Sequence, residues 1–374
     1  MKSTRQNSFH HQAGFSLIEI LVGLLIGLLA TLVIMQVFSV FEGQKRTTSG
    51  SADAQTNGSI ALYTIGREIK MAGFGLIPFT NSPLNCTVLD YGATGITDIS
   101  PVIISDGGAA AGASDTITVR YGDSASGGVP SPITGVGMAD GLASDNDVAI
   151  ANNMGCHVGD VALMVNGATC NFTNVSGPTD IAIPPVASTP PNNIAVTLDS
   201  MSGAVHNANL SCLGNWVTTV FRVNPNYDPT GATGVADTQA YLERSGIPSV
   251  ADIVNIQAQY GITASGNNNQ ITNWVNATGA TWAAPSIADR NRIKAIHVAV
   301  VARNGLLEKD NVTSTCTTAK GTSNNGPCAW DDSNYDIAAP AIDLSNDPNW
   351  QRYRYRVFET IIPLRNMIWA KGTL

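Results

Sequence analysis

The sequence predicts an α+β protein in which a long N-terminal transmembrane α-helix precedes a β-rich globular domain. One observation behind this prediction is a single apolar run from Phe15 to Phe41, whose only formal charge is Glu19. The other is a change of pattern at Leu76, after which short apolar runs alternate with Gly, Pro, Asn and Asp. Short runs separated in this way are typical of strands and turns.

The apolar run is long enough to cross a membrane once. The stretch Ile20–Phe41 has 22 residues. As a helix it would span roughly 33 Å, against roughly 30 Å for the hydrocarbon core of a bilayer. The polar segment before it contains Lys2 and Arg5 and no acidic residue. Because such segments stay in the cytoplasm, the large remainder is expected on the far side of the membrane.

Glu19 lies near the start of the run, where an ionised carboxylate is costly and usually functional. It ends the string Gly14-Phe15-Ser16-Leu17-Ile18-Glu19, which resembles the type III signal of type IV pilins and pseudopilins. The resemblance implies that residues 1–14 are a leader peptide. Prepilin peptidase would cut between Gly14 and Phe15 and N-methylate Phe15. Glu19 would then set the register between subunits by pairing with the terminal amine of a neighbour.

Other interpretations of this end of the chain stay open. An ordinary secretory signal would need a small-x-small site just after the run, where the sequence is Ser39-Val40-Phe41. Ala52-Asp53-Ala54 has suitable residues but lies too far downstream. The run could also be a plain uncleaved anchor, with Glu19 as a side chain that reaches the headgroups.

The helix is expected to pack closely and to continue past the membrane. Gly23 and Gly27 form a GxxxG pair, which either brings two helices together or simply permits bundle packing. An apolar stripe from Ile60 to Ile69 predicts helix up to Met71. The predicted parts are a transmembrane assembly helix over 15–41, a periplasmic continuation over 42–75, an imperfect turn near Gly50 and a stop at Gly73 and Gly75.

The remainder, residues 76–374, is predicted to form the β-rich domain. The predicted strands are Val102–Ser105, Thr116–Tyr121, Val158–Val165, Ile194–Leu198, Trp216–Val223, Gln239–Glu243, Lys294–Arg303 and Tyr353–Pro363. Ser249–Gln259 is predicted as a helix over the sheet, and Asn304-Gly305 as a hairpin turn. The predicted loops are Gly107–Ser114, Ser124–Ala143 and Ser265–Gln270.

Charge and cysteine content suit a domain outside the cytoplasm. The formal net charge is -8, and Arg120 is the only Lys or Arg between Lys70 and Arg222. Such a surface does not attract phosphate backbones, so nucleic acid is a poor default partner. Six cysteines in an exported chain indicate disulfides, with buried free thiols as the alternative. Closeness in sequence predicts Cys156–Cys170 and Cys316–Cys328, which leaves Cys86–Cys212 as the third pair.

Four phrases narrow the resemblance to one family. They are REIKMAGF at 67–74, DTITVRYG at 115–122, IQAQYG at 256–261 and RYRYRVFETIIPLRN at 352–366. Together they resemble PilW-type minor pilins, which are related to the J pseudopilin of type II secretion. The resemblance covers both ends of the chain well and the middle only loosely.

The resemblance implies a minor pilin rather than an enzyme, one that primes type IV pilus assembly and sits at or near the tip. Its partners would be prepilin peptidase, other minor pilins, the major pilin and a tip adhesin. It would start as a single-pass protein of the bacterial inner membrane, with its domain in the periplasm, and end in the pilus at the cell surface. The alternatives are a J-like pseudopilin of a type II secretion system and a membrane-anchored surface or DNA-binding receptor.

The sequence offers little for catalysis or metal binding. It contains no HExxH, GxSxG, P-loop or Rossmann motif, and no cofactor is expected. Asp332, Asn334, Asp336 and Asp343 have the spacing of an EF-hand loop, with Ile337 in place of its turn Gly. They are a weak calcium candidate, and a plain polar loop is the alternative.

Two further features could have either a functional or a purely structural role. Arg352, Arg354 and Arg356 are predicted on one face of a strand, where they would contact DNA or an acidic partner, or simply pair with acids of a neighbouring strand. His297 falls in a predicted strand and is expected to be packed rather than catalytic.

Overall fold

The computed structural model describes most of the chain beyond residue 15. The described residues are 16–76, 86–136, 146–153, 155–177, 181–182, 194–200, 202–205, 208–228, 230, 239–266 and 268–369. Two compact units divide between Ala52 and Asp53.

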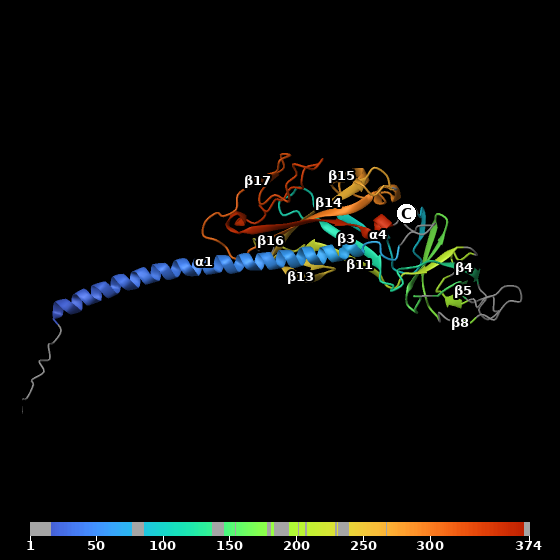
Figure 1. Ribbon diagram of the computed structural model, residues 1–374, viewed down its shortest axis with the longest axis horizontal. Coiled ribbons are helices and arrows are strands. Elements are labelled where there is room, and N and C mark those ends of the chain that lie inside the picture. The colour runs from blue at the N-terminus through green and yellow to red at the C-terminus, as the bar shows by residue number, and fades with distance from the viewer. Residues whose placement is uncertain are drawn as a thin grey trace, which may run out of the picture. The chain divides into compact units, whose positions relative to one another are not determined.

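Helix α1, Leu17–Met71, is unbroken (Figure 1). Its first part is long and apolar enough to cross a membrane, with a mean hydropathy of 2.8 over its most apolar window. The predicted imperfection near Gly50 is wrong, since residues on both sides of it are helical. The end of the helix is as predicted, because Gly73 and Gly75 follow it with φ of +74° and +84°. Glycine adopts such left-handed conformations without the steric cost of a Cβ.

Three sheets make up most of the domain. A four-stranded antiparallel sheet has the order β15-β14-β16-β19. Its strands are β14 (Ile253–Thr263), β15 (Ile271–Val275), β16 (Ile293–Arg303) and β19 (Tyr355–Pro363). A five-stranded antiparallel sheet has the order β13-β12-β11-β3-β2. Its strands are β2 (Val102–Ser105), β3 (Thr116–Gly122), β11 (Trp216–Val223), β12 (Tyr241–Arg244) and β13 (Ile247–Ala251).

An eight-stranded sheet comes almost entirely from the chain between β3 and β11, and β4, β5 and β8 of this sheet are labelled in Figure 1. Its order is β1-β7-β6-β10-β4-β5-β9-β8. The strands are β1 (Val88–Asp90), β4 (Ser131–Val136), β5 (Asp147–Ile150), β6 (Val161–Asn166), β7 (Thr169–Asn174), β8 (Ile181–Ala182), β9 (Ile194–Thr197) and β10 (Asn209–Cys212).

The remaining elements are short. They are α2 (Gly279–Trp282), α3 (Ile287–Arg290), α4 (Arg365–Trp369), the 3-10 helix η2 (Trp350–Arg352) and a two-stranded pair of β17 (Cys316–Thr317) with β18 (Ser323–Asn324).

Several predictions for the β region are wrong in detail. Most of Ser249–Gln259 belongs to β14 rather than to a helix, and β14 is buried along its whole length. A strand buried on both faces shows no alternation of apolar and polar residues, so its pattern is easily taken for a helix. Asn304-Gly305 closes no hairpin, because β16 pairs with the distant β19. Ser124–Ala143 contains strand β4 as well as loop.

The second half of α1 forms part of the main core. Ala61, Ile65, Ile69 and Ala72 have no exposed surface and pack with side chains of the four- and five-stranded sheets. Ala61, Ile65 and Ile69 are three or four residues apart, so their side chains lie on one face of the helix. The eight-stranded sheet has a separate core of its own, which includes Ile133, Val148 and Leu210.

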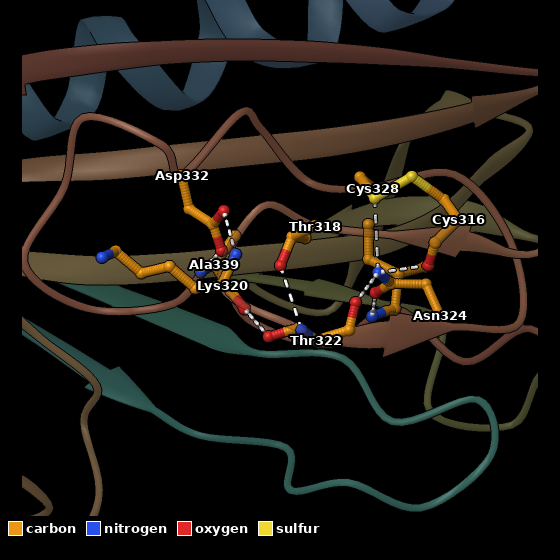
Figure 2. Close-up of a disulfide and its surroundings, with 9 residues drawn as sticks. Cys316, Thr318, Lys320, Thr322, Asn324, Cys328, Asp332 and Ala339 are labelled. Atoms are coloured by element: carbon orange, nitrogen blue, oxygen red, sulfur yellow. Dashed lines mark hydrogen bonds between the residues drawn. A yellow bond between two sulfur atoms is a disulfide. The ribbon is translucent and has the colours of Figure 1, made fainter.

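The disulfides differ from two of the three predicted pairs. Cys316–Cys328 is present, whereas the other bonds are Cys86–Cys170 and Cys156–Cys212, not Cys156–Cys170 and Cys86–Cys212 (Figure 2 shows the first). Strand pairing explains the difference. Cys170 lies in β7 beside β1, just after Cys86, while Cys212 ends β10 beside β6. Neighbouring strands therefore bring together cysteines that are far apart in sequence.

The contact between α1 and β19 predicts opposite effects for two helical glycines. A Cβ on Gly58 would overlap the ring of Phe358, whereas one on Gly66 would lie 3.6 Å from Ile362, an ordinary contact. We expect Gly58→Ala to lower the free energy of unfolding by about 1–3 kcal/mol through overpacking. Gly66→Ala is the matched control and should raise it by up to about 1 kcal/mol through helix propensity.

Denaturant unfolding of the full chain in detergent, with disulfides intact, measures both. Equal stability of the two variants would contradict this packing of helix and sheet.

Candidate assembly site

The apolar part of α1 presents its side chains outward. Large hydrophobic residues from Leu17 to Phe41 are all about half or more exposed within the described chain. Gly23 and Gly27 have no atom within 4 Å of where a Cβ would be. This surface needs lipid or other helices to cover it, because water does not solvate it favourably.

Glu19 is the one charged group in this surface. Its carboxylate oxygen Oε2 accepts a hydrogen bond from the backbone N–H of Ser16, at 3.1 Å. This satisfies one of the free N–H groups at the start of the helix. No other described residue bonds this side chain, so it retains acceptor capacity for another charge. Gly14 and Phe15, the predicted cleavage site, lie outside the described residues.

The other part of α1 is attached to the sheets by a buried carboxylate. Glu68 is 5% exposed. It accepts hydrogen bonds from the Tyr121 hydroxyl and the Arg244 guanidinium, both at 2.8 Å. Burial, together with the hydrogen bond to Glu68, raises the pKa of Tyr121 to about 12. The charge of Glu68 is thus paired and hydrogen-bonded, as a buried carboxylate requires.

The end of α1 is held from two directions. Gly73 N–H donates to the Arg120 carbonyl at 2.9 Å, and Gly122 N–H donates to the Phe74 carbonyl at 2.8 Å. The Asn366 amide donates to the carbonyls of Met71 and Ala72, at 3.3 and 3.0 Å. The last carbonyl groups of an α-helix have no partner within the helix. The Asn366 amide supplies partners for two carbonyls at this end of α1, and the two backbone bonds hold the residues that follow it.

A second carboxylate joins two of the sheets. Asp115 precedes β3, and its two oxygens accept hydrogen bonds from Gly107 N–H at 2.9 Å and Ala258 N–H at 2.8 Å. Ala258 belongs to β14. The four phrases that carried the family resemblance therefore meet in space: the helix end, β3, β14 and the segment from β19 to Asn366.

A groove opens beside this junction. It has a volume of about 780 Å³. The residues that line it are Ser59, Leu62, Tyr63, Gly66, Arg67, Glu68, Lys70, Met71 and Tyr121 together with Phe358, Glu359, Thr360, Ile361 and Ile362. It thus runs between the second half of α1 and strand β19. No sequence pattern predicts this groove, because its two walls are almost 300 residues apart in the chain.

Comparison with known protein families gives two matches. Residues 233–366 match the family described as type IV pilus-assembly protein W, PilW. Residues 9–35 match the prokaryotic N-terminal methylation motif. Both are consistent with a PilW-type pilin. No curated protein and no solved structure matches the chain.

The two matches cover different parts of the fold. The PilW range contains all of the four-stranded sheet as well as β12 and β13. The eight-stranded sheet lies between the two matched ranges, within residues 88–212. The PilW family is a pilus-assembly family of structural rather than enzymatic proteins.

The three aspartates proposed for calcium have separate hydrogen-bond partners. Asp332 accepts backbone N–H groups of Lys320 and Ala339, both at 3.0 Å (Figure 2). Asp336 accepts from Asn273 and Trp274, and Asp343 from Asn325 and Ser345. Each of these carboxylates thus has partners of its own. Among the described residues, no group of three or more His, Cys, Asp or Glu side chains is placed to hold a metal ion.

His297 is packed in the described structure. Its ring is 2% exposed and stacks on Trp330, with 3.8 Å between ring centres. Burial lowers the pKa of His297 to about 4, so the ring is neutral at neutral pH. Its Nε2 lies 3.4 Å from a carboxylate oxygen of Glu359.

The predicted arginine stripe is only partly a strand. Arg352 lies in η2, and β19 begins at Tyr355. Arg352 and Arg354 both contact Glu308, through its carbonyl at 2.8 Å and its carboxylate at 2.9 Å. Arg352 and Arg354 thus bond within the chain, but Glu308 lies outside the strands and not on a neighbouring strand as the alternative expected.

The bonds of Asp332 predict a pH-dependent contribution to stability. Burial alone would raise its pKa, but the backbone N–H groups of Ala339 and Lys320 outweigh burial and lower it. We expect Asp332→Asn to lower the free energy of unfolding by about 1.5–3 kcal/mol at pH 7, because a charged acceptor of two bonds is lost. A lowered folded-state pKa stabilises the fold above the unfolded pKa, and this contribution disappears as the pH falls through the folded pKa.

Denaturant unfolding at pH 7 and near pH 3 measures this difference, which should shrink at the lower pH. Asp331→Asn is the matched control, since Asp331 is exposed and accepts only the local Ser333 N–H. A loss with Asp331→Asn equal to that with Asp332→Asn would contradict the assigned role.

Proposed function

We propose that this protein is a minor pilin that primes assembly of a type IV pilus and occupies its tip or a position near it. The observation that carries the proposal is the connection of three parts in one chain. These are the Gly14-Phe15 and Glu19 motif, an outward-facing apolar helix and a PilW-matching domain in which the same helix ends.

In this proposal the leader is removed, whereas the helix is kept. Prepilin peptidase hydrolyses the peptide bond after Gly14 and methylates the new amine of Phe15. Gly14 suits a narrow protease site, because it has no side chain. Residues 1–14 are removed, whereas the apolar helix stays attached and becomes the assembly element. The processed chain stays in the inner membrane with its domain in the periplasm until it enters a filament.

Assembly replaces lipid around the helix by other helices. Because lipid is as apolar as these side chains, close packing and polar contacts decide the register. Glu19 supplies the polar contact: its carboxylate pairs with the amine of Phe15 of a neighbouring subunit. An unpaired carboxylate in such surroundings costs several kcal/mol, so subunits that are out of register are disfavoured. Other minor pilins, the major pilin and a tip adhesin are the partners of this surface.

A type II secretion pseudopilin would share the signal and the helix. The PilW match favours the pilus, and the genes beside this one provide a separate discriminator. The eight-stranded sheet, outside both matched ranges, is the observation that favours an additional surface-binding role at the tip.

Processing is tested by intact mass and N-terminal analysis of the protein from cells with and without prepilin peptidase. We expect loss of residues 1–14 and gain of one methyl group on Phe15, both only when the peptidase is present. Gly14→Val should leave the chain at full length, because a branched side chain blocks the cut. A processed terminus at Ala54, or the same mass in both strains, would rule out a prepilin.

The role of Glu19 is tested by Glu19→Gln, which keeps a side-chain acceptor for Ser16 N–H but removes the charge. We expect normal processing and at least about tenfold less of the chain in sheared filaments, because a buried ion pair is lost. Glu42→Gln is the control, since Glu42 is exposed on the same helix beyond the apolar run. Incorporation of Glu19→Gln at the level of the control would refute the pairing.

A further inference from the structure

Strand β19 ends its sheet, so one of its edges has no strand partner. The other edge pairs with β16 over its full length, from Pro363 opposite Ala295 to Tyr355 opposite Arg303. An uncovered edge of nine residues is a ready template for another strand, and proteins normally cover or disrupt such edges.

The pairing shows which backbone groups of β19 are free. Asn304 N–H donates to the Arg354 carbonyl, and Leu364 N–H donates to the Lys294 carbonyl, both at 2.8 Å. Bonded pairs recur at every second residue of an antiparallel ladder, so the even-numbered residues of β19 bond β16. Val357, Glu359 and Ile361 therefore direct N–H and C=O away from it. None of these backbone groups has a hydrogen-bond partner among the described residues.

The groove lies along this same edge and has apolar walls. Tyr63 on α1 is 72% exposed, and Ile361 on β19 is 43% exposed. Leu62 and Phe358 also line the groove and are half-buried. A strand placed on the edge would thus find apolar surface for every second side chain, in addition to main-chain hydrogen bonds.

The helix side of the groove is basic. Arg67 and Lys70 are both exposed, and neither has an ion-pair partner among the described residues. The one carboxylate of that wall, Glu68, is already paired with Arg244. The groove therefore favours an occupant that carries negative charge toward the helix.

We infer that the edge of β19 and the groove beside α1 form a docking site for an extended, apolar and acidic segment of a different filament subunit. That segment would add to the sheet as a strand, and its carboxylates would pair with Arg67 and Lys70. The inference rests on the proposed function and names how a neighbouring subunit attaches.

The described chain itself offers no such segment. Apart from β19, the strands that end a sheet are β1, β2, β8, β13, β15, β17 and β18. Only β1 among these contains a carboxylate, and it has three residues. Among its described edge strands, a second copy of this protein would therefore supply no acidic strand of sufficient length, so the expected occupant is a different subunit.

The test uses the full-length chain in piliated cells, with a photo-crosslinking amino acid in place of Tyr63. We expect a crosslink to another pilus subunit, at a stretch that has a carboxylate within two residues of the attachment point. The same amino acid in place of Ile247, which is 69% exposed on β13, is the control and should not give that product. Mass spectrometry identifies the attached peptide.

Two variants remove the site by different routes. Ile361→Pro deletes an outward N–H and leaves the bonds to β16 intact, as the natural Pro363 does at the next outward position. Arg67→Glu with Lys70→Glu reverses the charge of the groove. Each should lower the crosslink yield at least about tenfold. The matched controls are Ile361→Val and Lys309→Glu, an exposed lysine away from the groove, and both should keep the yield.

The outcomes separate this inference from the proposed function. Loss of the crosslink in both variants, with processing intact, supports the docking site. If Ile361→Pro misfolds, the charge-reversed variant still decides. Unchanged yield in the charge-reversed variant overturns the inference, as does a crosslink to a second copy of this chain or to a segment without a carboxylate. Absence of the unmodified chain from filaments would instead count against the proposed function.

Discussion

The buried carboxylate of Glu68 is the interaction on which the arrangement of this protein depends. It joins the helix to Tyr121 of β3 and Arg244 of β12, within a core built on Ile65 and Ile69. Apolar packing alone is tolerant of small rotations, whereas a buried ion must keep both of its partners or leave an unpaired charge. The pair therefore fixes the rotation of the helix against the five-stranded sheet. Within the domain, this constraint also sets which residues of the helix line the groove.

One helix thus has two different surroundings. Up to Phe41 its large side chains are exposed and need lipid or other helices, while from Ala54 onward one face is buried in a domain core. Different interactions stabilise the two parts, because lipid offers no hydrophobic driving force between helices, whereas water does. The domain end is held by many apolar contacts and by the bonds of the buried Glu68 carboxylate to Tyr121 and to the partly exposed Arg244. The apolar end has a single carboxylate, Glu19, in a surface that is otherwise without charge up to Phe41.

The sequence was sufficient to predict the elements that are determined by neighbouring residues along the chain. The helix end at Gly73 and Gly75, and strands such as Trp216–Val223, follow from turn chemistry and short patterns. It was not sufficient to predict features that depend on pairing between strands far apart in the sequence. β14 lost its alternation because both faces are covered, and the cysteines follow strand neighbours rather than sequence distance. The groove is the extreme case, since Tyr63 and Ile361 are joined only by the tertiary fold.

The eight-stranded sheet is built mainly from a long connection between two neighbouring strands. β3 and β11 are antiparallel neighbours, with Gly122 opposite Trp216, so the chain between them leaves and returns at one point. There Asn215 donates to both oxygens of Asp123, at 2.7 and 3.1 Å. Closing a loop costs entropy that grows only with the logarithm of its length, so a long insertion is tolerated if its ends stay close. The inserted part then needs stability of its own, which its separate core and the Cys156–Cys212 bond supply. Both side chains that bond Glu68, those of Tyr121 and Arg244, lie outside this connection, in β3 and β12.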